Sequence, residues 1–180
     1  MRVRTLVLTL LAILIITATG RVTAQSPATK ATPPATLNQL MRGIMFPNAN
    51  VIFAAQDTDP ATVPQASDPS TATDPLAGSY GGWQAVENSG LAIAEAASLL
   101  TVPGRTCSNG RPVPTQNADW NEFVTGLREA GLAAVKAAQA KNQDQILDVA
   151  DKVTEACSNC HDVYREKTLA QGGAANRCTK

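Results

Sequence analysis

The stretch that decides the fold is QDQILDVADKVTEACSNCHDVY, residues 143–164. Its apolar residues and cysteines recur every three or four positions, which is the period of one face of an α-helix. This stripe consists of Ile146, Val149, Ala150, Val153, Cys157, Cys160, His161 and Tyr164. The pattern predicts an amphipathic helix that begins near Gln143, buries one face in a core and ends before Gly172-Gly173.

The region before this helix predicts a helix in two pieces and a long loop. Residues 37–46 place leucine, isoleucine and methionine side chains on one helical face. We expect Pro47 to break or kink this helix before a second piece over residues 48–55. Residues 57–79 hold four prolines and four aspartates without a basic residue. A connection of 23 residues is too long for an ordinary loop between packed helices, so we expect it to be irregular.

Two further helices lie between the loop and the final stretch. The first of these begins at Trp83 and ends before Pro103-Gly104. The next is capped by Asn117 or Asp119 and runs to about residue 141, with Glu122 at the spacing of a capping box. The aromatic residues of the helices are expected mainly in the core; these are Phe46, Trp83 and Trp120.

We therefore expect one all-α domain over residues 37–180, an antiparallel up-down-up-down four-helix bundle with a long irregular acidic loop at 57–79 between the first and second helices. The chain has 180 residues, which suits a single domain. Its 15 basic residues balance 15 acidic ones, so we expect no nucleic-acid partner. One histidine excludes any site built from two imidazoles. No paired carboxylates, phosphate loop or serine–base pair stands out, and we do not expect an enzyme.

The N-terminus has the pattern of a secretory signal peptide. Arg2 and Arg4 precede an apolar run of 11 residues, 6–16, and small residues follow up to Ala24. Crossing a bilayer takes about 20 apolar residues, so a retained anchor is the weaker alternative. We expect residues 1–24 to be removed and residues 25–36 to form a flexible leader of a periplasmic protein. Removal of the signal peptide takes away three arginines, so the mature chain would have 12 basic and 15 acidic residues. We expect the mature chain to have no membrane span.

The chemical signal is Cys157-Ser-Asn-Cys-His161, a C-x-x-C-H motif typical of c-type haem attachment. Thiols three residues apart lie on one side of a helix, where both can bond to the same edge of a porphyrin. His161 lies one turn after Cys157 and can reach the iron from that side. The motif predicts one covalently attached haem c, with Cys157 and Cys160 as anchors and His161 as an iron ligand.

Other interpretations of the motif remain open. A thioredoxin-like dithiol is typical of a βαβ context, which this chain does not show. Zinc would need a further ligand such as Cys107. The chain would then be a helical domain stapled by zinc or by a disulfide, without haem.

Residues 157–165, CSNCHDVYR, resemble the attachment motif of the class II c-type cytochromes, the cytochrome c-prime family and its low-spin relatives. A weaker likeness extends over most of residues 37–167, through Leu40-Met41 and Pro47. The resemblance implies that Arg165 lies near the imidazole or a haem propionate and influences the potential.

In low-spin members of this family a methionine of the first helix is the sixth iron ligand. The resemblance makes Met41 our choice for this ligand, and Met45, one turn away, is the substitute. Both could instead only fill the core. With methionine bound, we expect one-electron transfer between redox proteins. With an open sixth position, the resemblance implies binding of nitric oxide or carbon monoxide. Dimers occur in this family, and a homodimer is possible here.

The remaining cysteines, Cys107 and Cys178, are expected to form a disulfide. In an up-down-up-down bundle the second and fourth helices end at the same pole, so the loop 101–117 and the C-terminal tail should meet. Export supplies an oxidising compartment. Two unpaired thiols are the alternative.

Overall fold

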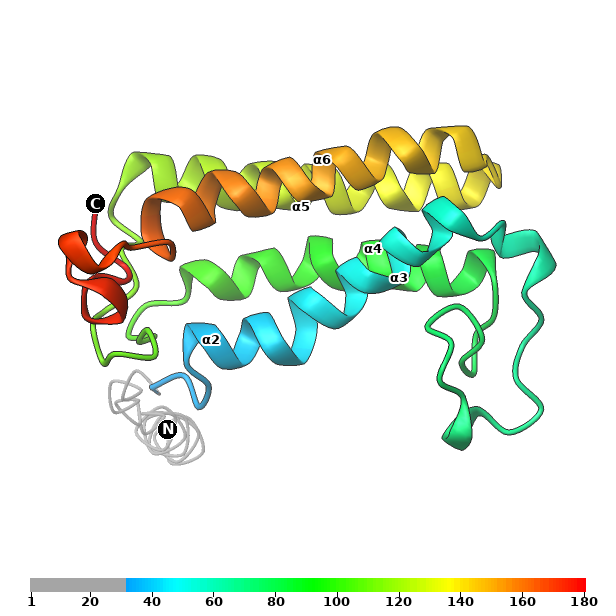
Figure 1. Cartoon of the computed structure of the whole chain (residues 1–180), viewed down its shortest axis with the longest axis horizontal. Helices are drawn as coiled ribbons and strands as arrows, with labels where there is room; N and C mark the ends of the chain where they lie inside the picture. The colour runs from blue at the N-terminus through cyan, green and yellow to red at the C-terminus, as the bar shows by residue number, and fades with distance from the viewer. Residues whose placement is uncertain (1–31) are drawn as a thin grey trace, which may run out of the picture. The chain divides into compact units, whose positions relative to one another are not determined.

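A computed structural model describes residues 32–180. The predicted signal peptide, residues 1–24, and most of the predicted leader, 25–36, lie outside the described residues. The described part is mostly helical and forms no strand, apart from one bridge between Thr106 and Pro112 (Figure 1). The all-α class expected from the sequence is confirmed. None of the helices within residues 32–180 is both long enough and apolar enough to cross a membrane.

The helical elements follow the chain in the expected order (Figure 1). The first is continuous in three parts, α2 (Leu37–Leu40), the π-helical turn η1 (Met41–Met45) and α3 (Phe46–Asp57). The others are α4 (Trp83–Ala96), which runs on into the 3₁₀ turn η4 (Ala97–Thr101), α5 (Ala118–Ala140) and α6 (Gln143–Tyr164). Short 3₁₀ turns are η2 (Pro60–Thr62) and η3 (Pro69–Thr71) after α3, and η5 (Leu169–Gln171) and η6 (Gly173–Asn176) in the tail.

Pro47 does not divide the first helix in the expected way. The helix continues through Pro47, and the irregularity precedes it as the turn η1. In this turn the Phe46 N–H donates to the Met41 carbonyl oxygen, five residues back. A proline ring clashes with the carbonyl four residues earlier in a regular helix. The wider turn accommodates the ring, so one bent helix replaces two separate pieces.

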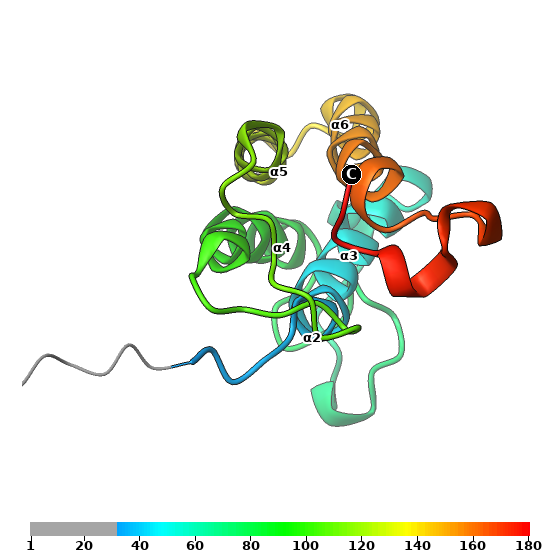
Figure 2. The same cartoon turned by 90° about the vertical axis from the view of Figure 1, so that its left-hand side faces the viewer.

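Each of the four main helices packs against two others: α3 on α4, α4 on α5, α5 on α6 and α6 on α3 (Figure 2). The helices α4 and α5 approach each other closely at two glycines. A Cβ atom added to Gly90 would lie 2.8 Å from the carbonyl oxygen of Gly131, and one added to Gly131 would lie 2.8 Å from that of Gly90. The core between the helices contains the fully buried side chains of Ile52, Val86, Ile93, Trp120, Ile146 and Val153.

The connection after α3 is irregular, as expected, but it is anchored at its ends. Pro60 and Leu76 are buried. The backbone of Ala66 donates to the Ala77 carbonyl oxygen at 3.1 Å, so the two limbs of the loop pair near its exit. Two buried residues thus fix the ends of the loop, while most of its other residues are exposed.

The predicted capping box at the start of α5 does not form. Asn117 is the N-cap residue and makes no side-chain capping bond. Asp119 lies inside the first turn, where its carboxylate accepts hydrogen bonds from the Trp120 backbone and the Tyr164 hydroxyl instead of capping the helix. A capping box does form at α2, between Thr36 and Gln39.

Candidate functional site

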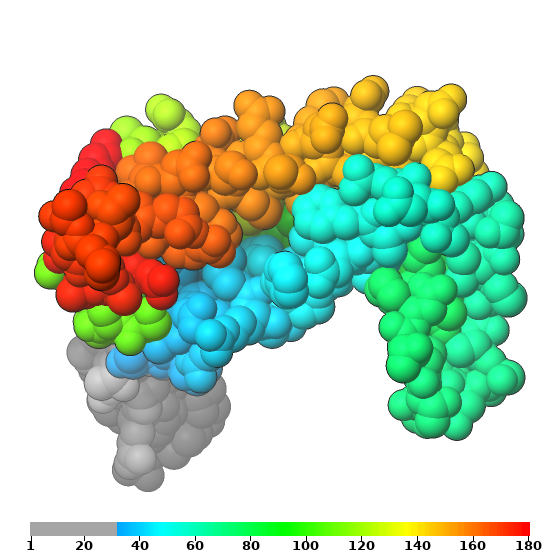
Figure 3. Space-filling model, in the orientation of Figure 1, coloured from blue at the N-terminus to red at the C-terminus, as the bar shows by residue number. Residues whose placement is uncertain are grey.

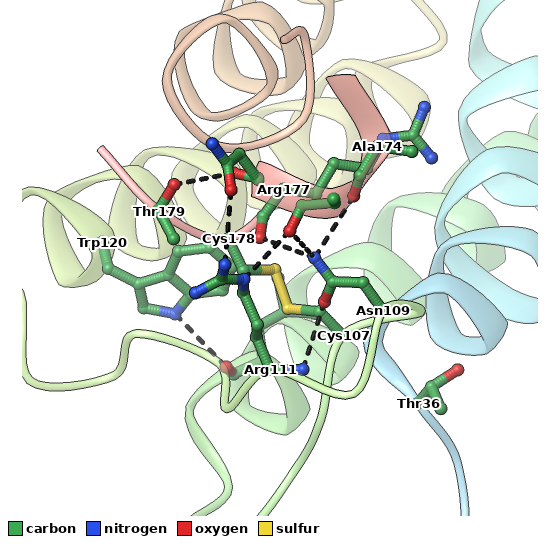
Figure 4. The surroundings of a disulfide bond; sticks show 12 residues. Thr36, Cys107, Asn109, Arg111, Trp120, Ala174, Arg177, Cys178 and Thr179 are labelled. Carbon is green, nitrogen blue, oxygen red and sulfur yellow. Dashed lines mark hydrogen bonds between the residues drawn. A yellow bond between two sulfur atoms is a disulfide. The ribbon is translucent and has the colours of Figure 1, made fainter. Parts of the chain in front are cut away.

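A disulfide between Cys107 and Cys178 closes one pole of the domain (Figure 4). The two Cα atoms are 6.6 Å apart, and this is the pair that the sequence suggests. Hydrogen bonds from Asn109 and Arg111 reinforce the link between the loop and the tail. Asn109 Nδ2 donates to the carbonyl oxygens of Ala174, Ala175 and Arg177 at 3.0–3.2 Å, and Arg111 Nε donates to that of Ala175 at 2.9 Å.

Cys157, Cys160 and His161 lie in the last two turns of α6, and all three are half-buried. Their side chains line a cavity of about 620 Å³ between α6 and the first helix. A smaller pocket of about 70 Å³ adjoins it at Cys160 and His161. Cofactor and ligand sites in proteins have volumes of roughly 300–1,000 Å³. The motif therefore opens onto a space of cofactor size.

The cavity arises from the course of the first helix. Its second half, α3, packs against α6, whereas the residues before Phe46 make hardly any backbone contact with α6. In the space-filling view a furrow separates the surface of α6, in orange, from that of the first helix, in blue and cyan (Figure 3). Most of the wall is apolar and comes from Met41, Met45, Phe46, Ala49, Phe53, Leu100, Trp120, Phe123, Val124 and Leu127.

The two predicted sulfur ligands begin and end the π-helical turn on the wall across from the motif. Met45 is 6% exposed and Met41 is half-buried. Met41 lines both the cavity and the smaller pocket, as His161 does, while Met45 lines the cavity alone. Met41 is thus the methionine that shares more of its surroundings with His161.

The three aromatic residues expected mainly in the core differ in burial, and only Trp120 is fully buried as expected. Trp120 is 1% exposed, and its indole Nε1 donates to the Leu100 carbonyl oxygen at 3.2 Å. Its ring also packs edge-on against Tyr164, with centroids 5.1 Å apart. Trp83 is half-buried. Phe46 is 65% exposed, so its predicted core position is wrong. Phe46 directly follows the π turn and lines the cavity.

Burial shifts the pKa values of the two thiols and the imidazole of the motif. It raises the pKa of the Cys157 thiol, and it raises that of Cys160 to about 12, with nearby Cys157 and Asp119 adding to the shift. Burial also lowers the pKa of His161, and the positive charge of Arg165 lowers it further. At neutral pH the motif therefore presents two protonated thiols and a neutral imidazole, which is the form of histidine that binds metals.

Three arginines line the cavity, Arg42, Arg165 and Arg177. Arg165 is exposed and paired with Glu166, the one acidic residue in the lining. Arg177 was not singled out from the sequence, although it precedes a cysteine expected in a disulfide. Its Nε atom is buried and has no hydrogen-bond partner. The cavity thus combines apolar walls with a cationic edge.

The sequence-predicted residues converge at this site. Cys157, Cys160, His161, Met41, Met45 and Arg165 all line one cavity. Cys107 lines the smaller pocket, but its sulfur is bonded to Cys178. Within residues 32–180 no group of three or more histidine, cysteine, aspartate or glutamate residues is arranged to hold a metal ion. No family model, curated protein or solved structure matches this chain.

Proposed function

We propose that the protein is an exported monohaem c-type cytochrome of the class II kind, which transfers single electrons through a covalently attached haem c. The observation that carries this proposal is the convergence of a C-x-x-C-H motif and two methionines on facing walls of a cavity of about 620 Å³. The chain is not an enzyme in this account. Its partners are a donor and an acceptor protein in the periplasm.

The fold that goes with this function is an antiparallel up-down-up-down four-helix bundle. The closed sequence of helix contacts supports it. The connection between α5 and α6 is short, with Lys141 in the left-handed conformation at φ 51°. A two-residue connection between packed helices favours opposite directions.

The lining of the cavity fits a haem. A porphyrin needs apolar walls, and the wall residues from the first helix, α5 and η4 provide them. Its two propionates need cationic or solvent-facing surroundings, and Arg165 and Arg177 line the cavity together with His161. A zinc site would need a ligand beyond the motif, and Cys107 is engaged in the disulfide.

Each residue of the motif has a definite task. The thiols of Cys157 and Cys160 would hold the haem covalently, each by adding its sulfur and its hydrogen across one vinyl group, without an external oxidant or reductant. Neutral His161 would supply a nitrogen ligand to the iron. The haem supplies a one-electron Fe(III)/Fe(II) couple when bound.

Met41 is the sixth iron ligand in this proposal, with Met45 as the substitute. A methionine ligand favours ferrous iron and raises the reduction potential compared with an open site. The Met41 side chain, which shares both the cavity and the smaller pocket with His161, supports this choice.

The optical spectrum of the exported protein tests the proposal. The full chain, with its signal peptide, is produced in a bacterium that attaches haem to c-type cytochromes, and a Cys157→Ser, Cys160→Ser double variant is the control. We expect sharp α and β bands in the reduced protein and a near-infrared methionine–iron band in the oxidised one. A broad high-spin spectrum would support gas binding at an open iron instead. Absence of a Soret band contradicts haem binding altogether.

A further inference from the structure

Arg177 combines burial with a missing partner. Its Nε atom lies out of contact with solvent and has no hydrogen-bond acceptor, and it is the one buried side-chain nitrogen or oxygen in residues 32–180 in this condition. The Arg177 side chain forms no ion pair with the described residues either. A buried polar group without a partner costs roughly 1–3 kcal/mol, and more when it is charged. The residue as a whole is half-buried, so the outer nitrogen atoms of its guanidinium group are the ones open to a ligand in the cavity.

The backbone around Arg177 is held in place. Its carbonyl oxygen accepts a hydrogen bond from Asn109 Nδ2 at 3.0 Å. The next residue, Cys178, is bonded to Cys107, and its N–H donates to the Tyr164 carbonyl oxygen at 2.7 Å. Figure 4 shows this tail segment against the loop that carries Asn109. The tail therefore presents Arg177 from a position fixed by a covalent bond and two hydrogen bonds, all within two residues.

The position also faces the site. Arg177 lines both the cavity and the smaller pocket, in company with His161 and Arg165. Arg165 already has Glu166 as a partner, whereas Arg177 has none. A guanidinium group forms paired hydrogen bonds with a carboxylate. An arginine that lines the cavity without an ion pair among the described residues suits a carboxylate inside the cavity.

We propose that Arg177 binds one propionate carboxylate of the haem, and that the Cys107–Cys178 disulfide serves to hold it there. This inference rests on the proposed function, because the carboxylate belongs to the proposed cofactor. It makes the C-terminal tail, which follows the helix with the attachment motif, a part of the cofactor site.

The pH dependence of the reduction potential tests this inference on the holoprotein. An ionised propionate stabilises Fe(III), so the potential falls as the propionate loses its proton. A neighbouring arginine lowers the pKa of a carboxyl group by about 1–3 units. We expect Arg177→Gln to move the inflection in the potential upward by about 1–3 pH units compared with the wild type. Arg128→Gln, an exposed arginine on α5 outside the cavity, should leave the inflection unchanged.

An unchanged inflection in Arg177→Gln, in protein that still carries haem, overturns the role of Arg177 and leaves the proposed function standing. A wild-type protein without haem refutes the proposed function itself. If Arg177→Gln does not accumulate as folded protein, Arg177→Lys decides. Lysine keeps the charge but loses the paired hydrogen bonds, so a smaller upward movement supports the inference, and an inflection identical to the wild type overturns it.

Discussion

Among single residues, the two methionines of the first helix differ most clearly in their surroundings. Met41 and Met45 stand at the two ends of the same π turn, four positions apart, yet only Met41 reaches the small pocket beside His161. Their packing also differs, because Met45 is 6% exposed and belongs to the core. The same substitution at the two sites should therefore affect different properties.

In the proposed cytochrome, Met41→Ala should change the haem spectrum, and Met45→Ala should change the stability of the protein. Loss of the proposed sixth ligand would convert a low-spin spectrum to a high-spin one and open the iron to carbon monoxide. Loss of a buried methionine costs about 2–5 kcal/mol of unfolding free energy. Optical spectra with and without carbon monoxide, together with urea unfolding of both variants, measure the two effects. A high-spin spectrum in Met45→Ala alone would exchange the roles of the two residues.

Residue spacing predicts only some of this site. Cys157, Cys160 and His161 follow an i, i+3, i+4 spacing within one helix. The amino-acid sequence alone therefore places all three on one face of α6. Arg177 depends on a disulfide and on a tail that returns to the cavity. No local period marks such a residue, and it becomes visible only when the tail is placed in three dimensions.

Among the elements, α4 and α5 show how small residues set a helix contact. Gly131 lies against the α4 backbone, where an added Cβ would be 2.8 Å from the Gly90 oxygen and 2.9 Å from the Ala94 nitrogen. Gly126, on the same helix, has no atom within 4 Å of the corresponding position. Two glycines on one helix thus have opposite surroundings.

Gly131→Ala should destabilise the protein, and Gly126→Ala should stabilise it. The first change forces backbone atoms of α4 and α5 apart, which costs about 1–3 kcal/mol. The second replaces glycine in a helix interior without a clash, which gains about 0.5–1 kcal/mol. Urea unfolding of both variants against the wild type gives the two free energies. Equal destabilisation by both would show that α4 and α5 do not cross at Gly131.

The start of α5 is tied to the end of α6 and to the tail by Asp119. Its carboxylate accepts hydrogen bonds from the Tyr164 hydroxyl at 2.8 Å and from the Lys180 ammonium group at 2.9 Å. The Lys180 hydrogen bond is the main cause that lowers the pKa of Asp119, and the Tyr164 hydrogen bond contributes. The contribution to stability is therefore present above the ordinary aspartate pKa and disappears as the pH falls through the lowered value.

Asp119→Asn should be less stable than the wild type at neutral pH, and the difference should shrink below about pH 4. The wild type loses its ionised carboxylate there, while the asparagine variant has none to lose. Thermal unfolding of both proteins between pH 7 and pH 3 follows the change. A difference that stays constant over this range would rule out the ionised carboxylate as its source.

Element boundaries were predictable where the chain gives a strong period. The start of α6 at Gln143 and the irregular loop after α3 agree with the sequence. The π turn and the capping of α5 do not. The π turn depends on how the helix accommodates the Pro47 ring, and the capping depends on competing partners. Asp119 has Tyr164 and Lys180 to bind, and these contacts outweigh a local capping box.

At the scale of the whole molecule, the disulfide links residues 71 positions apart and joins the loop after η4 to the C-terminal tail. It was predictable only from the expected topology, in which helices of alternating direction would bring these segments to one pole. The cavity was not predictable, because it depends on how far the first half of the first helix diverges from α6. Neither the hydrophobic periodicity nor the amino-acid composition of the chain predicts such a divergence between two helices.

Replacement of both Cys107 and Cys178 by serine should lower the unfolding free energy by about 4 kcal/mol, the chain-entropy value for a loop of this length. The unfolded chain gains freedom when the loop is opened. Urea unfolding of oxidised wild type, reduced wild type and the double variant gives the values. Equal stability in all three would mean that the disulfide does not constrain the unfolded chain.

Mass spectrometry of the denatured, alkylated mature protein measures whether Cys157 and Cys160 carry a haem, as we propose. We expect a chain that begins at Gln25 and is heavier by one haem, with the added mass on the peptide that contains residues 157–161. Cys107 and Cys178 should resist alkylation until the protein is reduced. A chain in which Cys157 and Cys160 are both alkylated and no haem mass is found would contradict the account.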